Sequence, residues 1–190
     1  MKTEGERLIR FAVLVPHRDT GVLIRPYRRS LFAAGLAGAW SFPDAIPLAR
    51  LSKALSADEL KTLALTLRAL SLEDGCKGWF RSAGAAAETL PSFAGFYGPL
   101  FNVPAPPVRL FPAETLLHRF PRLVLGAALT GGTPPAAQLP EAPKLSFRAA
   151  AVSNLILRPL SSGDKDFSFE WKFGKPVWLS PVRLHKTGGF

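Results

Sequence analysis

The order of hydrophobic and polar positions predicts a chain that mixes strands and helices. The run Phe11–Val15 is apolar at almost every position, which favours a strand buried on both faces. A helix is predicted after Pro26, because proline fits the first turn of a helix. This helix would run from Tyr27 to Gly35 or Gly38.

The segment SADELKTLALTLRAL predicts a second helix. Ser56 and Glu59 have the spacing of a capping box, in which each side chain bonds a free backbone N–H at the helix start. Leucine and alanine residues three and four positions apart then form one apolar stripe. We therefore predict a helix from Ala57 to Leu70.

The middle of the chain is rich in proline. Of the 18 prolines, 11 fall between Pro91 and Pro143, a density that argues against a regular central sheet. Because the same stretch holds many aromatic residues that need burial, we predict an ordered insertion over residues 91–143, wrapped on the core. Within it we expect a helical piece near Ala113 to Arg119 and a mobile loop at Gly131 to Pro135.

The last quarter of the chain predicts strands. An apolar run covers Phe147 to Leu157, and residues 167–173 alternate between aromatic and polar positions, as in a half-exposed strand. A final strand is expected from Val177 towards Leu184. The order of strand, helix, strand, helix, insertion and several strands predicts an α+β fold.

Composition narrows the class of protein. The 190 residues are 47% hydrophobic, which indicates one folded domain, or one built from two small lobes, rather than a disordered basic tail. The single cysteine, Cys76, excludes a disulfide scaffold and a four-thiolate zinc site. Because no apolar run reaches the length of a membrane span or a secretory signal, we expect a cytoplasmic protein with no membrane partner.

The charge points to an acidic partner. The chain has 24 Lys and Arg against 14 Asp and Glu, a formal net charge of +10. Arginine neutralises phosphate and aromatic rings stack on bases, so interleaved basic and aromatic residues favour single-stranded nucleic acid as a partner. The basic residues form three groups along the chain: Arg18, Arg25, Arg28 and Arg29; Arg109, Arg119 and Arg122; and Lys172, Lys175, Arg183 and Lys186.

Two segments resemble the paired motifs of a known family. The first is IPLARL at 46–51, followed by the SADEL helix, and the second is SNLILR at 153–158, followed by aromatic strands. In spacing and flanks they resemble the two His-x-Thr/Ser strands of the 2H phosphoesterases, which include RNA ligase-like and cyclic phosphodiesterase proteins. The opening strand FAVLVP is similar to the first strand of that family.

The resemblance implies a single domain over residues 1–190 with two pseudo-symmetric lobes. Their antiparallel sheets would form a cleft, with helices on the outside. In active members of the family, one histidine from each motif flanks a phosphodiester, one as general base and the other as general acid. A hydroxyl two residues after each histidine binds phosphate.

This chain departs from the family pattern at all four positions. Pro47 and Asn154 stand in place of the histidines, and Ala49 and Ile156 in place of the hydroxyls. Neither proline nor an amide titrates, so the resemblance implies an inactive protein. Asn154 and Arg158 would remain in the cleft to bind RNA, a nucleotide or another phosphorylated ligand, with no cofactor and no metal.

Two alternatives stay open. A displaced histidine, His17 or His118, would make the chain an active phosphoesterase; His185 is the third histidine. Alternatively, the insertion would dock on a protein partner through its aromatic residues, which are Phe93, Phe96, Tyr97 and Phe101.

Overall fold

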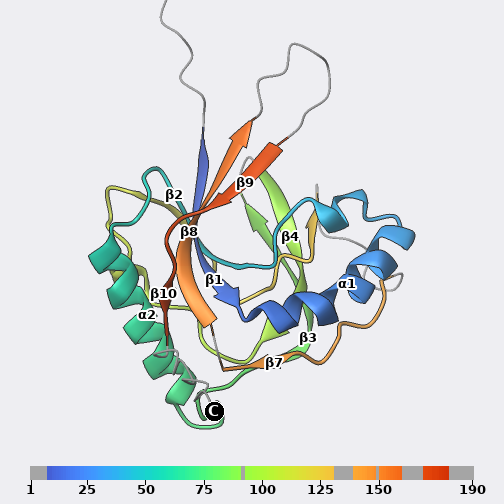
Figure 1. The fold of residues 1–190 in the computed structure, drawn as a ribbon, viewed down its shortest axis with the longest axis horizontal. Helices are drawn as coiled ribbons and strands as arrows, with labels where there is room; N and C mark the ends of the chain where they lie inside the picture. Colours follow the sequence, from blue (N-terminus) through green and yellow to red (C-terminus); the bar gives the residue numbers. More distant parts are fainter. Residues whose placement is uncertain (1–7, 91–92, 131–138, 149, 160–168, 180–190) are drawn as a thin grey trace, which may run out of the picture.

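The computed structural model describes residues 8–90, 93–130, 139–148, 150–159 and 169–179. Over these residues the chain forms two α-helices and two antiparallel sheets, which confirms the predicted α+β class. The helices lie on the outside of the molecule (Figure 1). The elements in chain order are β1 (Ile9–Pro16), α1 (Arg18–Ala33), the 3₁₀ turn η1 (Ala37–Trp40), β2 (Ile46–Leu51), α2 (Ala57–Leu72), β3 (Phe80–Leu90), β4 (Phe93–Phe101), the 3₁₀ turn η2 (Val108–Leu110), β5 (Leu116–Arg119), β6 (Ala128–Thr130), β7 (Ser146–Phe147), β8 (Ala150–Pro159), β9 (Phe169–Phe173) and β10 (Val177–Trp178).

The first sheet has six strands in the order β10-β8-β1-β2-β5, with β9 also paired to β8. Strand β1 lies between β2 and β8 and pairs antiparallel with both. Its residues Phe11 to Leu14 are all inaccessible to solvent, which confirms the prediction of a strand buried on both faces. The strand can be apolar throughout because both of its faces are covered.

The second sheet, in the order β6-β4-β3-β7, corrects the prediction for the proline-rich stretch. Strand β4 belongs to that stretch and pairs with both β3 and β6. Pro99 is tolerated within it because it lies opposite Ala85, where the pairing with β3 shifts register. The helix predicted near Ala113 to Arg119 is also wrong: a turn is followed by β5, whose partner is β2.

The helix predicted after Pro26 begins earlier. His17 caps α1 by accepting a hydrogen bond from the backbone N–H of Asp19, and Pro26 lies inside the helix. Because Pro26 is on the exposed side, the carbonyl group that it leaves unpaired faces water. For α2 the capping box is confirmed, with Ser56 N–H donating to Glu59 Oε2 at 2.6 Å. This helix ends at Leu72 rather than at Leu70.

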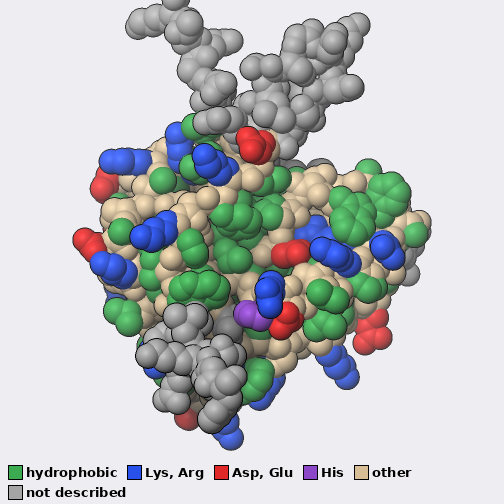
Figure 2. All heavy atoms as spheres, in the orientation of Figure 1, with side chains coloured by type: hydrophobic (Ala, Val, Ile, Leu, Met, Phe, Trp, Pro, Cys, Tyr) green, Lys and Arg blue, Asp and Glu red, His purple; other side chains and the backbone are tan. Residues whose placement is uncertain are grey.

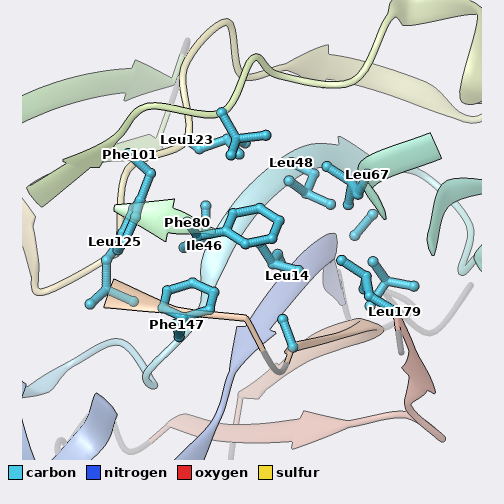
Figure 3. Close-up of a cluster of buried hydrophobic side chains, with 14 of the residues drawn as sticks. Leu14, Ile46, Leu48, Leu67, Phe80, Phe101, Leu123, Leu125, Phe147 and Leu179 are labelled. Carbon is cyan, nitrogen blue, oxygen red and sulfur yellow. The ribbon is translucent and has the colours of Figure 1, made fainter. Parts of the chain in front are cut away.

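Two clusters of side chains fill the interior. The larger cluster joins β1, β2 and α2 to the second sheet, and Figure 3 shows its leucine, isoleucine and phenylalanine side chains pointing toward one another. The smaller cluster is made by Phe11, Phe42, Phe96, Phe120 and neighbouring apolar residues. Alternate residues of β1 belong to different clusters, so each face of this strand packs against its own core.

The apolar run predicted as one strand from Phe147 to Leu157 is divided. Phe147 belongs to β7 in the second sheet, and β8 begins at Ala150 in the first sheet. Strands β9 and β10 lie within the regions predicted for the last two strands. The loop predicted at Gly131 to Pro135, together with residues 160–168 and 180–190, lies outside the described residues.

Candidate functional site

Asn154, a predicted ligand contact, is used to hold the backbone before α2. Its Oδ1 accepts a hydrogen bond from the Leu55 N–H at 2.9 Å, and its Nδ2 donates to the Leu55 carbonyl at 2.8 Å. The side chain is 8% exposed. Asn154 therefore lies on the α2 side of the sheet, whereas Leu155 packs in the opposite cluster with Phe11.

Pro47 and Asn154 do not face each other across a gap, because both belong to the six-stranded sheet with β1 between them. A β-bulge in β2 sets Ala49 opposite Ala12 but Pro47 opposite Val13. Since paired residues share a face, Pro47 and Ala49 lie on opposite sides of the sheet, unlike residues two apart in a regular strand. Arg158 belongs to β8, but its side chain lies outside the described part of the chain.

Aromatic rings occupy the space between the two sheets at the level of β1. Phe11 of β1 meets Phe96 of β4 edge to face, with 5.8 Å between ring centroids. Phe42 and Trp171 close the cluster at 4.9 Å, and Trp171 Nε1 donates to the Ser41 carbonyl at 2.7 Å. Rings held in this geometry stabilise the packing of the sheets and offer no acid or base.

His118, the first candidate for a displaced histidine, lies in β5. It pairs with Arg50 across β5 and β2, and its ring lies edge to face on Phe120. Its Nε2 is buried and has no hydrogen-bond partner among the residues that the structure describes. Burial lowers the pKa of His118, the nearby Glu88 carboxylate opposes this effect, and Arg50 adds to it. A neutral imidazole is therefore favoured.

No described contact joins His118 to the second candidate, His17. His17 caps α1, and its Nδ1 lies 3.0 Å from Asp19. Glu88, the carboxylate near His118, is only 5% exposed and is bound by Arg122 Nε at 2.5 Å. The described residues thus contain no pair of histidines placed as the family chemistry requires, and His185 lies outside them.

The basic groups predicted from the sequence do not form one surface. Arg28 is 3% exposed, and its guanidinium donates to the carbonyls of Ala39, Gly126 and Ala127 and to Asp44. Figure 2 shows Lys and Arg side chains spread over one face of the molecule, with hydrophobic side chains gathered in its middle. On this face the positive charge is dispersed.

A concentrated group of cations lies elsewhere, at the end of α2. A hollow of about 270 Å³ is lined by Arg68, Lys77 and Arg148, together with Ser71, Leu72, Gly78 and Leu179. All three cations are exposed, and among the described residues no carboxylate pairs with any of them. We call this hollow the basic pocket. Three unneutralised cations around one hollow are suited to an anion.

The turn that carries Lys77 is tightly held. Lys77 has a φ of 49°, in the left-handed region, between Gly75 and Gly78, which both have positive φ. The backbone N–H of Gly78 donates to the Ser71 carbonyl, which anchors the turn to the last turn of α2. A lysine in this conformation is held against its backbone preference, and such residues are found often at ligand sites.

A stack of cations and one ring borders the basic pocket. The guanidinium carbon of Arg148 lies 4.5 Å from the centroid of the Trp79 ring, and that of Arg81 lies 5.6 Å from it. Trp79 is half-buried, whereas both arginines are exposed. Trp79 and Arg81 lie two residues apart, whereas Arg148 comes from a distant segment, so only the fold brings the three together.

Other kinds of site find no support in the described residues. No group of three or more His, Cys, Asp and Glu residues there could hold a metal ion. None of the helices in the described ranges has the length and apolar character that a membrane crossing needs.

A scan against protein-family models, a search of curated proteins and a search of solved structures each found no match to this chain.

Proposed function

We propose that this protein binds a phosphorylated ligand, a nucleotide or RNA, and does not cleave it. The observation that carries the proposal is the basic pocket, where Arg68, Lys77 and Arg148 surround one hollow with no carboxylate partner among the described residues. Phosphate oxygens accept the hydrogen bonds that guanidinium and ammonium groups donate. The pocket, rather than the surface charge in general, is the proposed site.

The resemblance to 2H phosphoesterases supports the absence of cleavage. In this proposal the chain is a degenerate relative of that family, with proline and asparagine at positions 47 and 154. The order β1, α1, β2 and α2 agrees with the order expected from the resemblance. Asn154 is committed to Leu55, which fits a structural use of a former catalytic position.

The test is a titration of the ¹⁵N-labelled protein with uridine 5′-monophosphate and with inorganic pyrophosphate, followed by NMR at low salt. We expect shifts at the amides of Lys77, Gly78 and Trp79, which form or border the basic pocket. The affinity should fall as salt is added, because ionic contacts to phosphate are screened. The double variant Arg68→Gln/Lys77→Gln should abolish these shifts.

A matched control is available on α1. Arg25→Gln/Arg29→Gln removes the same charge from exposed positions of a helix that does not line the pocket. It should leave the affinity unchanged. The proposal fails if neither probe binds at low salt, or if the control variant weakens binding as much as the pocket variant does.

The alternative of a protein partner docking on the aromatic residues of the insertion is weakened by their burial. Phe96 is inaccessible to solvent and Phe101 is 4% exposed. The side chain of Phe93 lies outside the described residues, and Tyr97 is half-buried. A partner would meet little of the aromatic surface that this alternative needs.

A further inference from the structure

A second hollow includes Arg81, one of the two arginines that lie against the Trp79 ring. This hollow, of about 330 Å³, is lined by Arg81, Lys144 and Glu141, and its apolar walls are formed by Ala83, Ala142, Pro143 and Leu145. We call it the mixed pocket. One acid against two cations, with apolar walls, suits a base and sugar better than it suits phosphate.

The mixed pocket lies over an irregularity of β3. Pairing with β4 shifts register between Ser82 and Ala85, and Gly84 has a φ of 81° with open space where a side chain would stand. The residues of this bulge, Ala83 and Gly84, have no paired residue on β4. Their backbone is therefore accessible to a ligand that lies in the pocket.

The two pockets are joined by the stack. Arg81 lines the mixed pocket, Arg148 lines the basic pocket, and both guanidinium groups lie against the Trp79 ring. The guanidinium carbons of Arg81 and Arg148 are therefore no farther apart than the sum of their distances from the centroid of the Trp79 ring. A guanidinium plane that is itself held on a ring offers its outer face to an unstacked base.

We infer that the ligand is a single-stranded nucleic acid that crosses both pockets, with phosphate in the basic pocket and a neighbouring nucleoside in the mixed pocket. This inference rests on the proposed function and names its ligand class. A mononucleotide site buries most of its ligand, whereas these pockets are open hollows joined by exposed arginines. An open, continuous surface of cations beside a ring fits a chain that runs across it.

The test measures fluorescence anisotropy of a labelled oligouridylate of about twelve nucleotides. We expect the dissociation constant of this oligomer to be at least ten times smaller than that of uridine 5′-monophosphate, which is measured by competition against the labelled oligomer. Titration with an oligodeoxynucleotide of the same length shows whether the protein prefers RNA or DNA. A duplex of the same length should bind at least five times more weakly than the single strand. Binding of the oligomer no tighter than that of the monophosphate would overturn the inference.

Variants separate this inference from the proposed function. Lys144→Gln and Arg81→Gln change exposed side chains of the mixed pocket. Each should lower the oligomer affinity at least threefold and leave pyrophosphate binding unchanged. Trp79→Leu should lower the oligomer affinity at least fivefold, and the two charge variants cover the case in which it fails to fold. If pyrophosphate binds the basic pocket but neither charge variant affects the oligomer, the proposed function stands and the inference falls.

Discussion

Replacing Asn154 tests whether its side chain stabilises the fold, through its hydrogen bonds to Leu55, or contacts a ligand, as predicted from the sequence. In Asn154→Ala, the N–H and the carbonyl of Leu55 would both lose their hydrogen-bond partner in a region where Leu55 is 5% exposed. Each buried group left without a partner costs about 1–3 kcal/mol. We therefore expect the free energy of unfolding to fall by about 3 kcal/mol, and the melting temperature by about 6–12 °C for a domain of this size.

Urea denaturation followed by circular dichroism measures this change. Asn154→Leu, which keeps the volume and removes both hydrogen bonds, should cost a similar amount. Thr62→Ala, at an exposed position on α2, is the control and should change stability by less than about 0.5 kcal/mol. Below the transition, Asn154→Ala should bind uridine 5′-monophosphate as the wild type does. A variant of wild-type stability that no longer binds the nucleotide would refute the reasoning.

Three further predictions concern other parts of the fold. Arg28→Met should lower the free energy of unfolding by about 3 kcal/mol in a chemical denaturation, because it leaves three carbonyls and Asp44 without their donor. Ser56→Ala, which removes half of the capping box, should cost about 1 kcal/mol in the same assay; no change would show that the cap is dispensable. Folding lowers the pKa of His118, so the unfolded chain binds more protons than the folded chain does. The neutral His118 therefore contributes to stability above pH 6.5, and this contribution is lost as the pH falls through and below that value. Melting temperatures between neutral pH and pH 5 should therefore fall less in His118→Gln than in the wild type, and parallel curves would contradict the prediction.

The parts of the fold that the sequence predicted correctly are those fixed by local signals. The capping box at Ser56 and the apolar stripe after it are read within one segment, so α2 was placed to within two residues of its end. The start of α1 was missed because its cap is a histidine and its proline lies on the exposed side. Strand β5 was taken for a helix because its partner β2 lies far away in the sequence, with Ala49 opposite Arg119.

The candidate site could not be predicted in the same way. Arg68 lies within α2, Lys77 lies in the turn that follows it, and Arg148 comes after β7, so only the fold brings Arg148 to the other two around one hollow. The one local signal is the glycine-rich turn at residues 74–78, and its sequence gives no indication that Arg148 lies beside it. The residues at positions 47 and 154 lie apart because both belong to one sheet with β1 between them, and the bulge in β2 interrupts the alternation that a regular strand would have.

The bulge in β2 bears on how the chain could change in future. If Pro47 and Ala49 were replaced by histidine and threonine, the two new side chains would emerge on opposite sides of the sheet. Substitution alone would therefore not rebuild the motif, because the bulge itself would have to be removed before the side chains at positions 47 and 49 could share a face. The backbone register of β2 therefore opposes a His-x-Thr motif at this place, whereas exposed residues such as those of the basic pocket can change without altering the sheet.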